Sequence, residues 1–295
     1  MMSNFIAGWI RFSLAIVTVL ATSWNVALAQ NQPSGLLFSE RFEDAKLLSR
    51  GWYDGKSFTL VEDRPGSGNQ SIQYHFTKGK LTPVDSSGVR RSIEPTDVVH
   101  LRFSIKLSSD WTWTGRPYGP HLLHFMTTEN SKYHGPAHSH LTVYIEPVNG
   151  KLRLATQDIQ NASQPHGLTQ GQLKGGYNGQ FFDSKDVLFD DGKWHTVEAM
   201  FKLNSLDLAK STPNADGELR AWVDGKRVIE RTDVVFRSTD FPTMKFNQFL
   251  MTPYFHHGVP HDQTLWIDNL AVGTERLGPV GNEAGVTDPK ASDVP

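Results

Sequence analysis

Histidine and tyrosine side chains recur at alternate positions in two segments that have the composition of β-strands. The polar positions are Gln248, Thr252, Tyr254 and His256 in one segment, and His140, Thr142, Tyr144 and Glu146 in the other. Because successive side chains of a strand point to opposite faces, each set shares one face, and the apolar residues between them take the other. Groups that can exchange protons would thus line one surface of a sheet. A polymer could lie along such a surface.

Most of the remaining chain also has strand patterns. Runs that alternate, or that are rich in β-branched and aromatic residues, occur at 71–76, 98–107, 121–126, 140–146, 151–156, 194–203, 218–223, 246–255 and 265–272. Turn sequences separate them, above all Asn149-Gly150, whose type I′ turn requires positive φ at both central residues. Only 43–50 and 203–209 could form a helical turn or two. We therefore predict an all-β fold, a two-sheet antiparallel β-sandwich.

The two ends of the chain differ in composition from the predicted sandwich. Residues 1–29 contain Arg11, an apolar stretch and the small-residue pattern Ala27-Leu-Ala29, which predicts a cleaved export signal. The apolar stretch is shorter than the roughly 20 residues that span a bilayer, so we expect no membrane span after cleavage. The sandwich domain is expected over 36–277. Residues 278–295 lack periodicity and are expected to form a disordered tail.

The charge and the cysteine content limit which partners the protein can bind and which cellular compartment it occupies. The formal net charge is −2, so the chain has no basic field that would attract nucleic acid. It has no cysteine and can form no disulfide, which, with the export signal, favours a bacterial periplasmic or extracellular location. The polar segment 157–188 is expected to be a long loop over the active face. The oligomeric state cannot be read from the sequence.

Four short motifs follow one another in an order that resembles a known fold. They are Phe38-Ser-Glu-Arg-Phe-Glu43, Asp191-Gly-Lys-Trp-His-Thr-Val197, Gly217-Glu-Leu-Arg-Ala-Trp-Val-Asp-Gly225 and Trp266-Ile-Asp-Asn-Leu270. This order is similar to that of the concanavalin A-like jelly roll of laminin G, glucanase and polysaccharide lyase domains. The resemblance covers the whole predicted sandwich and implies a jelly roll. That architecture serves enzymes, lectins and adhesion modules alike.

Among enzymes of this architecture, the chain most resembles the jelly-roll polysaccharide lyases, such as alginate and glucuronan lyases. Gly88-Val-Arg-Arg-Ser-Ile-Glu94 is similar to their strand with Arg and Glu, and Pro120-His-Leu-Leu-His-Phe125 to their strand with His. The segment 248–254 is similar to their late strand with Tyr. The Gln-Ile-His motif of the alginate group is absent, and Pro253 stands where the family usually has a small residue.

Such lyases remove the proton at C5 of a uronate and expel the oxygen at C4. The substrate carboxylate must be neutralised, a base must take the proton, and an acid must protonate the leaving oxygen. The resemblance implies that Arg91 neutralises the carboxylate, His124 is the base and Tyr254 is the acid. It further implies substrate-lining roles for His121, His140, Tyr144, Gln248 and His256. This elimination requires no cofactor.

Each of these side chains also has a structural interpretation. His124 could be a buried core histidine, and the tyrosines could pack across strands. The two arginines at 90 and 91 could form a solvated edge. Trp111 and Trp113 alternate in a loop rich in Thr and Gly, where they could stack on a pyranose ring or pack on the core. Both interpretations stay open at this point.

Histidine clusters and acidic residues raise the question of a metal ion. The segments 134–140 and 256–261 hold three histidines each, but neither has a helical i, i+4 context or an acidic partner string, which disfavours a transition metal. In these jelly rolls the terminal strands often meet around a structural calcium. The resemblance therefore implies that Glu40, Glu43 and Asp268 could supply hard oxygen ligands. The alternative is that these carboxylates form ion pairs.

Three function classes remain open. The first is an exported lyase that cleaves an acidic uronate polysaccharide by β-elimination, and the second is a non-catalytic, lectin-like carbohydrate-binding module of the cell envelope. The third is a structural or adhesion domain. A glucanase-type hydrolase is disfavoured, because we find no strand with carboxylates at alternate positions, as a retaining pair about 5 Å apart would need. A polysaccharide is the expected partner in the first two classes.

Overall fold

The computed structural model describes residues 35–63, 68, 70–116, 120–128, 140–157, 180–237, 239, 242–278 and 280. All of them belong to the compact unit Gln32–Pro295. The expected export signal lies outside the described residues, as do most of the expected tail and most of the expected loop 157–188. None of the helices in the described ranges is long and apolar enough to cross a membrane.

The first layer is an eight-stranded antiparallel sheet. Its order is β15 (Lys226–Val234), β14 (Gly217–Val223), β11 (Trp194–Lys202), β6 (Val98–Leu107), β17 (Gln263–Gly273), β4 (Ser71–Phe76) and β3 (Thr59–Val61). β1 (Leu36–Glu40) pairs with one end of β17. β6 and β17 lie in the middle of this sheet and pair along most of their length, with a register shift between Asp268 and Ala271.

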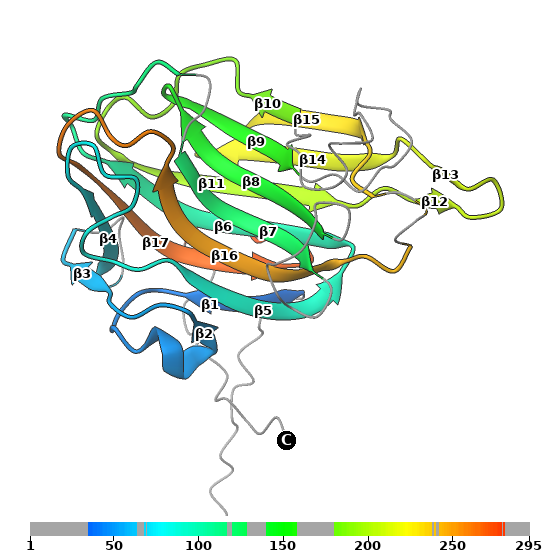
Figure 1. Cartoon of the computed structure of the whole chain (residues 1–295), viewed down its shortest axis with the longest axis horizontal. Coiled ribbons are helices and arrows are strands. Elements are labelled where there is room, and N and C mark those ends of the chain that lie inside the picture. Colours follow the sequence, from blue (N-terminus) through cyan, green and yellow to red (C-terminus); the bar gives the residue numbers. More distant parts are fainter. Residues whose placement is uncertain are drawn as a thin grey trace, which may run out of the picture. The chain divides into compact units, whose positions relative to one another are not determined.

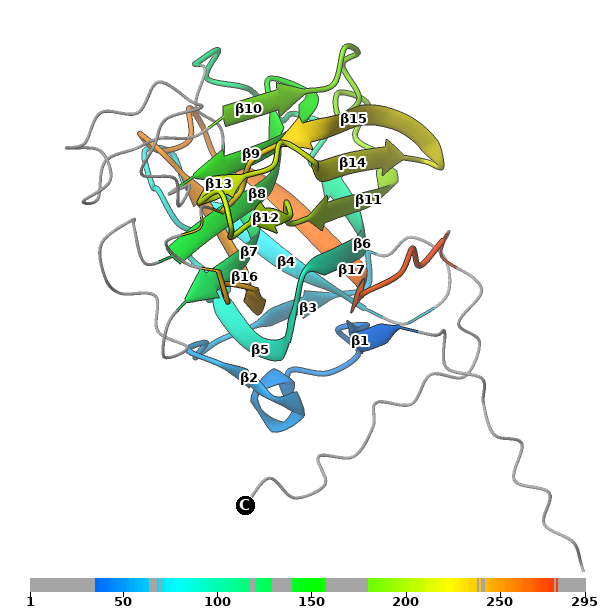
Figure 2. The same ribbon diagram turned by 90° about the vertical axis from the view of Figure 1, so that its right-hand side faces the viewer.

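The second layer is a seven-stranded antiparallel sheet. Its order is β10 (Gln180–Asp183), β9 (Lys151–Gln157), β8 (His140–Val148), β7 (Pro120–Thr128), β16 (Phe246–Phe255), β5 (Val89–Thr96) and β2 (Trp52–Tyr53). Figure 1 and Figure 2 show it as one of two stacked layers. The predicted β-sandwich is confirmed.

Aromatic side chains fill the space between the two layers. Phe38 of β1 meets Trp52 of β2 edge-on at 5.6 Å between ring centroids, and Phe249 of β16 lies 5.8 Å from Phe38. Phe249 in turn lies 5.2 Å from Phe125 of β7. All four are nearly fully buried, and burial of each such ring stabilises the fold by about 1.5–3 kcal/mol. These contacts join strands that are far apart in the sequence.

Of the turns, helices and loops predicted from the sequence, the structure confirms some and contradicts others. Asn149 and Gly150 have φ of 50° and 78°, so the predicted hairpin turn is confirmed. The helical expectation for 43–50 holds only as a single 3-10 turn, η1 (Leu47–Arg50). The expectation for 203–209 is wrong, because β12 (Leu206–Asp207) pairs there with β13 (Thr212–Pro213). The end of the expected loop 157–188 is also partly strand, since β10 pairs with β9.

Candidate active site

Cross-strand pairs sort the side chains of the seven-stranded sheet into two faces. One row of successive partners is Arg91, Phe249, Phe125 and Val143, of which the last three belong to the hydrophobic core. The next row is Arg90, Leu250, His124 and Tyr144. Because neighbours along a strand point to opposite faces, this second row faces away from the core. We call this side of the sheet the outer face.

His124 and Tyr144 form the centre of the outer face. Their rings meet edge-on with centroids 4.5 Å apart, and the two residues are only 3% and 6% exposed. Burial lowers the pKa of His124 well below its ordinary value, and His121 nearby lowers it further. His124 is therefore a neutral imidazole at physiological pH. Its Nδ1 has no hydrogen-bond partner within the described part of the chain.

A register shift brings His121 onto the same face. Strict alternation from Phe125 through Leu123 would turn His121 into the core. The pairing of β16 with β7 shifts between Met251 and Tyr254, however, and His121 becomes the partner of Tyr254. Its ring stacks on that of Tyr254 at 6.2 Å and 11°, and lies 4.6 Å from Tyr144. His124 is 6.1 Å away. The shift thus joins two histidines and two tyrosines in one cluster.

Glu146, in β8, contacts the His121 ring of this cluster. Its side chain is 2% exposed, and its Oε2 is 3.3 Å from Nδ1 of His121, whose side chain is 29% exposed. Neither atom has a hydrogen-bond partner among the residues described, so their contact is an ion-pair approach. Burial raises the pKa of Glu146, an effect that His121 and Arg153 oppose. Arg153 is held by Asp183 at 2.6 Å on the neighbouring strands.

Amide and hydroxyl groups extend the outer face on the other side. Gln248, which is 1% exposed, donates from Nε2 to the Tyr53 hydroxyl at 2.6 Å. Its partner across β7 is Met126, and the next residue in that row is Thr142. The Thr142 hydroxyl is buried without a hydrogen-bond partner in the described ranges. Buried polar atoms without a partner are uncommon in native proteins.

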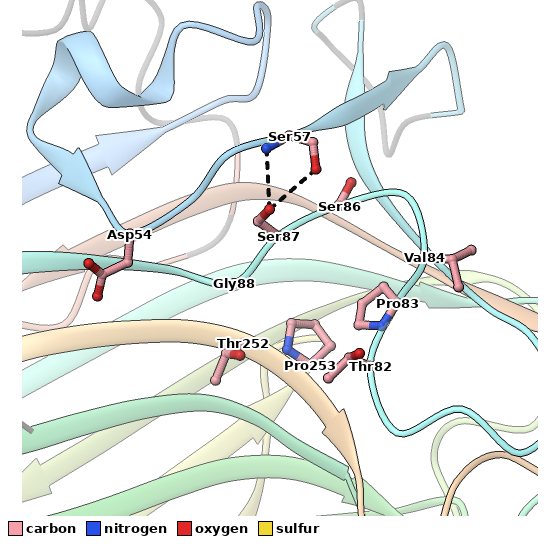
Figure 3. Close-up of a pocket in the computed structure, with 10 residues that line it drawn as sticks. All are labelled: Asp54, Ser57, Thr82, Pro83, Val84, Ser86, Ser87, Gly88, Thr252 and Pro253. Atoms are coloured by element: carbon pink, nitrogen blue, oxygen red, sulfur yellow. Dashed lines mark hydrogen bonds between the residues drawn. The ribbon is translucent and has the colours of Figure 1, made fainter.

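A cavity of about 340 Å³ opens beside the register shift (Figure 3). Hydroxyl groups line it, and the Ser57 and Ser87 hydroxyls are 3.2 Å apart. A Cβ at Gly88 would collide with Thr252, so glycine allows β5 to begin this close to β16. Asp54 in the wall of the cavity pairs with Arg90 at 3.2 Å. The ion pair between Asp54 and Arg90 therefore connects the wall of the cavity to the row that contains His124.

Several residues expected at the site lie elsewhere. Arg91 was expected beside His124, but its guanidinium lies 4.5 Å over the Phe38 ring, because its row faces the core. The Trp111 ring packs on Phe255 with 5.4 Å between centroids, and the Trp113 ring packs on Trp111 with 5.8 Å between centroids. Both rings therefore pack against the hydrophobic core.

Two further histidines were expected to line the substrate. His256 follows the end of β16, is exposed, and lies 6.3 Å from Tyr254. It stacks on His257 at 4.2 Å between ring centroids. His140 pairs with Thr128 through the backbone of β8, and its side chain lies outside the described part of the structure.

Three outer-face residues were given no role from the sequence. Tyr53 belongs to a two-residue strand that is too short to leave a pattern. Arg90 was weighed only as part of a solvated edge, and its face depends on how β5 pairs with β16. Glu146 has the parity of the outer face in the sequence, but its approach to His121 depends on the register shift in another strand. Only the parity of Glu146 could have drawn attention to it.

Glu40, one of the three acidic residues expected to bind calcium, already accepts hydrogen bonds from its neighbours. Glu40 accepts hydrogen bonds from Arg50, from Trp52 Nε1 at 3.1 Å and from the backbone of Phe42 at 3.0 Å. Burial raises the pKa of Asp268 to about 7. The described residues contain no group of three His, Cys, Asp or Glu side chains that could hold a metal ion. Calcium binding by Glu40, Glu43 and Asp268 therefore stays a prediction.

Solved structures with the same fold include two alginate lyases. The chain superposes on alginate lyase vAL-1 from Chlorella virus with a TM-score of 0.59 at 14% identity, covering 83% of this chain and 100% of that one. It superposes on a mutant of alginate lyase Aly36B with bound alginate trisaccharide with a TM-score of 0.54 at 14% identity, covering 82% and 99%. At this identity the likeness shows the fold alone.

Sequence comparison gives the family. No curated protein matches the chain. The family model described as "Polysaccharide lyase" matches residues 50–271, a span that runs from the strand of Tyr53 through β17 and includes the whole outer face. The expected resemblance to the jelly-roll lyases is thereby confirmed. The chain belongs to the polysaccharide lyase family.

Proposed function

We propose that this lyase-family protein cleaves an acidic polysaccharide built from uronate units, by β-elimination at the outer face. The observation that carries the proposal is the unbroken contact of proton-transfer groups on that face. His124 contacts Tyr144, which contacts His121, which stacks on Tyr254. A base and an acid on the same face of a sheet are what an elimination requires.

The reaction needs three contributions from the protein. A neutral imidazole takes the C5 proton, and the electron pair forms the C4–C5 double bond as the C4–O bond breaks. The Tyr254 hydroxyl gives its proton to the leaving oxygen. His124 is the base proposed from the sequence, and its lowered pKa keeps it in the form that accepts a proton. His121 is a second histidine in the same cluster.

Arg90 neutralises the substrate carboxylate in this proposal. Arg90 is in the row of His124, whereas Arg91 lies over Phe38. A guanidinium can bind a carboxylate through two parallel hydrogen bonds. Export of the mature protein, which would bring it to such polymers, stays a prediction.

A panel of polymers tests the proposal. The purified protein is incubated with uronate polymers and, as a control, with a neutral glucan, while ultraviolet absorbance follows the new double bond conjugated to the carboxylate. We expect absorbance to rise with at least one uronate polymer and with no neutral one. A protein that is inert on every uronate polymer, yet is retained on a polysaccharide column, would be a binding module and would contradict the proposal.

A further inference from the structure

Glu146 is a buried carboxylate on the outer face, and the elimination described above gives it no role. It lies in β8, its side chain is 2% exposed, and its Oε2 points to Nδ1 of His121 at 3.3 Å. Taking an ionised carboxylate out of water costs several kcal/mol unless a partner compensates. No described residue hydrogen-bonds this oxygen, and none hydrogen-bonds Nδ1 of His121. The 3.3 Å approach of these two atoms is thus an ion-pair contact, and the contact is short enough for a proton on Nδ1 to be shared with the carboxylate.

The two histidines of the cluster differ in access to a substrate. His124 is 3% exposed, and the His121 side chain is 29% exposed. A base must come within hydrogen-bond reach of the proton that it removes. The His121 side chain is the more accessible of the two to a substrate, and it also stacks directly on Tyr254, the proposed acid. No ring contact between His124 and Tyr254 occurs among the described residues, and His121 contacts both of them.

We propose that His121 is the catalytic base of this lyase and that Glu146 is a positioning residue that holds it in the active tautomer. Nδ1–H of His121 donates to Glu146, which leaves the lone pair on Nε2 for the substrate. Nε2 takes the C5 proton, the C4–C5 double bond forms, and the C4–O bond breaks. Tyr254 protonates the leaving oxygen. The proton on His121 then returns through solvent to the Tyr254 phenolate, which restores both groups.

The role of Glu146 has the same physical basis as the aspartate of a Ser-His-Asp triad. A carboxylate behind the imidazole fixes which nitrogen carries the proton and stabilises the imidazolium that forms during the reaction. An amide in its place can donate to Nδ1 and leave the proton on the wrong nitrogen, which in that triad lowers kcat about 10⁴-fold. The other charged groups around Glu146 are Arg153 and Asp183, which pair with each other.

The test compares Glu146→Gln with the matched variant Glu198→Gln. Glu198 is also a buried carboxylate, 4% exposed, but it lies in the other sheet and is held by Arg276 at 2.8 and 3.0 Å. We expect Glu146→Gln to lower kcat by about 10²-fold or more with little change in KM, and to alter the pH profile. We expect Glu198→Gln to lower the melting temperature and to leave kcat, KM and the pH profile as in the parent.

Nitrogen-15 NMR of the histidine rings supplies a readout that does not depend on turnover. In the parent protein His121 should be in the Nδ1–H tautomer, and Glu146→Gln should shift it toward Nε2–H. Replacement of His121 by alanine should lower kcat further than the same change at His124. An unchanged tautomer and pH profile in Glu146→Gln, or a larger loss from His124→Ala, would overturn the inference.

This inference rests on the proposed function, but the two can fail separately. A parent protein without activity on any uronate polymer would remove the proposed elimination, and the NMR measurement would still report whether Glu146 sets the His121 tautomer. An active parent with a normal Glu146→Gln variant would leave the elimination in place and reject the role of Glu146. Folding of each variant is checked by its thermal unfolding.

Discussion

Replacement of Tyr254 by phenylalanine removes one hydroxyl group and leaves the ring in place. No described residue hydrogen-bonds this hydroxyl, so its loss breaks no contact of the described fold. The ring keeps its stack on His121 at 6.2 Å. A change at such a position alters the free energy of unfolding by about 0.5 kcal/mol or less. We therefore expect the variant to fold and to bind the polymer as the parent does.

The effect on turnover should be large. A positioned general acid contributes about 10²–10⁴-fold to a rate, which is about 3–5 kcal/mol of transition-state stabilisation. We expect kcat of Tyr254→Phe to fall by that factor while KM changes little, because the lost interaction exists only in the transition state. The assay is the ultraviolet absorbance of the unsaturated product, followed at several substrate concentrations.

The same chemical change elsewhere in the fold gives the control. Tyr74 is fully buried in β4 of the other sheet, and its hydroxyl has no hydrogen-bond partner in the described part of the chain. Tyr74→Phe should therefore leave kcat and KM unchanged. If Tyr254→Phe eliminates as fast as the parent, the hydroxyl does not protonate the leaving oxygen, and the reasoning from the outer face is refuted.

Three further predictions concern stability and processing. Burial lowers the pKa of His100 to about 4, so the folded state disfavours the protonated ring. The stability that the neutral ring contributes is fully present above the unfolded-state pKa near 6.5 and is lost as pH falls toward 4. His100→Gln should flatten this part of the pH dependence of urea unfolding, by about 3 kcal/mol at most. Glu40→Gln weakens a buried pair with Arg50, and should cost up to about 3–5 kcal/mol in the same assay; an unchanged midpoint would contradict the structural account. Exported protein should begin at Gln30 or its neighbour, and N-terminal sequencing that finds Met1 on secreted material would exclude cleavage.

The sandwich was predictable because strand patterns are local. The alternation of Leu141, Val143 and Ile145 with polar residues sets the two faces of β8 within a single segment, and the structure keeps them. The turn at Asn149-Gly150 is equally local. Strand β2 was not predictable, since two residues cannot show a period. It forms only because Trp52 and Tyr53 pair with β5.

The composition of the outer face was less predictable, because it depends on how separate strands pair. Arg90 and Arg91 are adjacent, so only the pairing of β5 with β16 decides which of them shares a row with His124. His121 reaches the outer face through a register shift between Met251 and Tyr254 that no pattern in β7 announces. The structure has Tyr144 and Tyr254 on the predicted face. Arg91, which the resemblance placed with them, shares the core face with Val89 and Ile93.

The positions of β16 and β17 bear on how the protein is made. These last two strands of the fold lie in the interior of the two sheets: β16 joins β5 to β7, and β17 joins β4 to β6 (Figure 1). Neither sheet can be completed until residues 246–273 have left the ribosome. Such long-range pairing slows folding. A nascent chain therefore stays open until synthesis of the domain is nearly finished, and a chain cut short before Phe246 loses the centre of both layers at once.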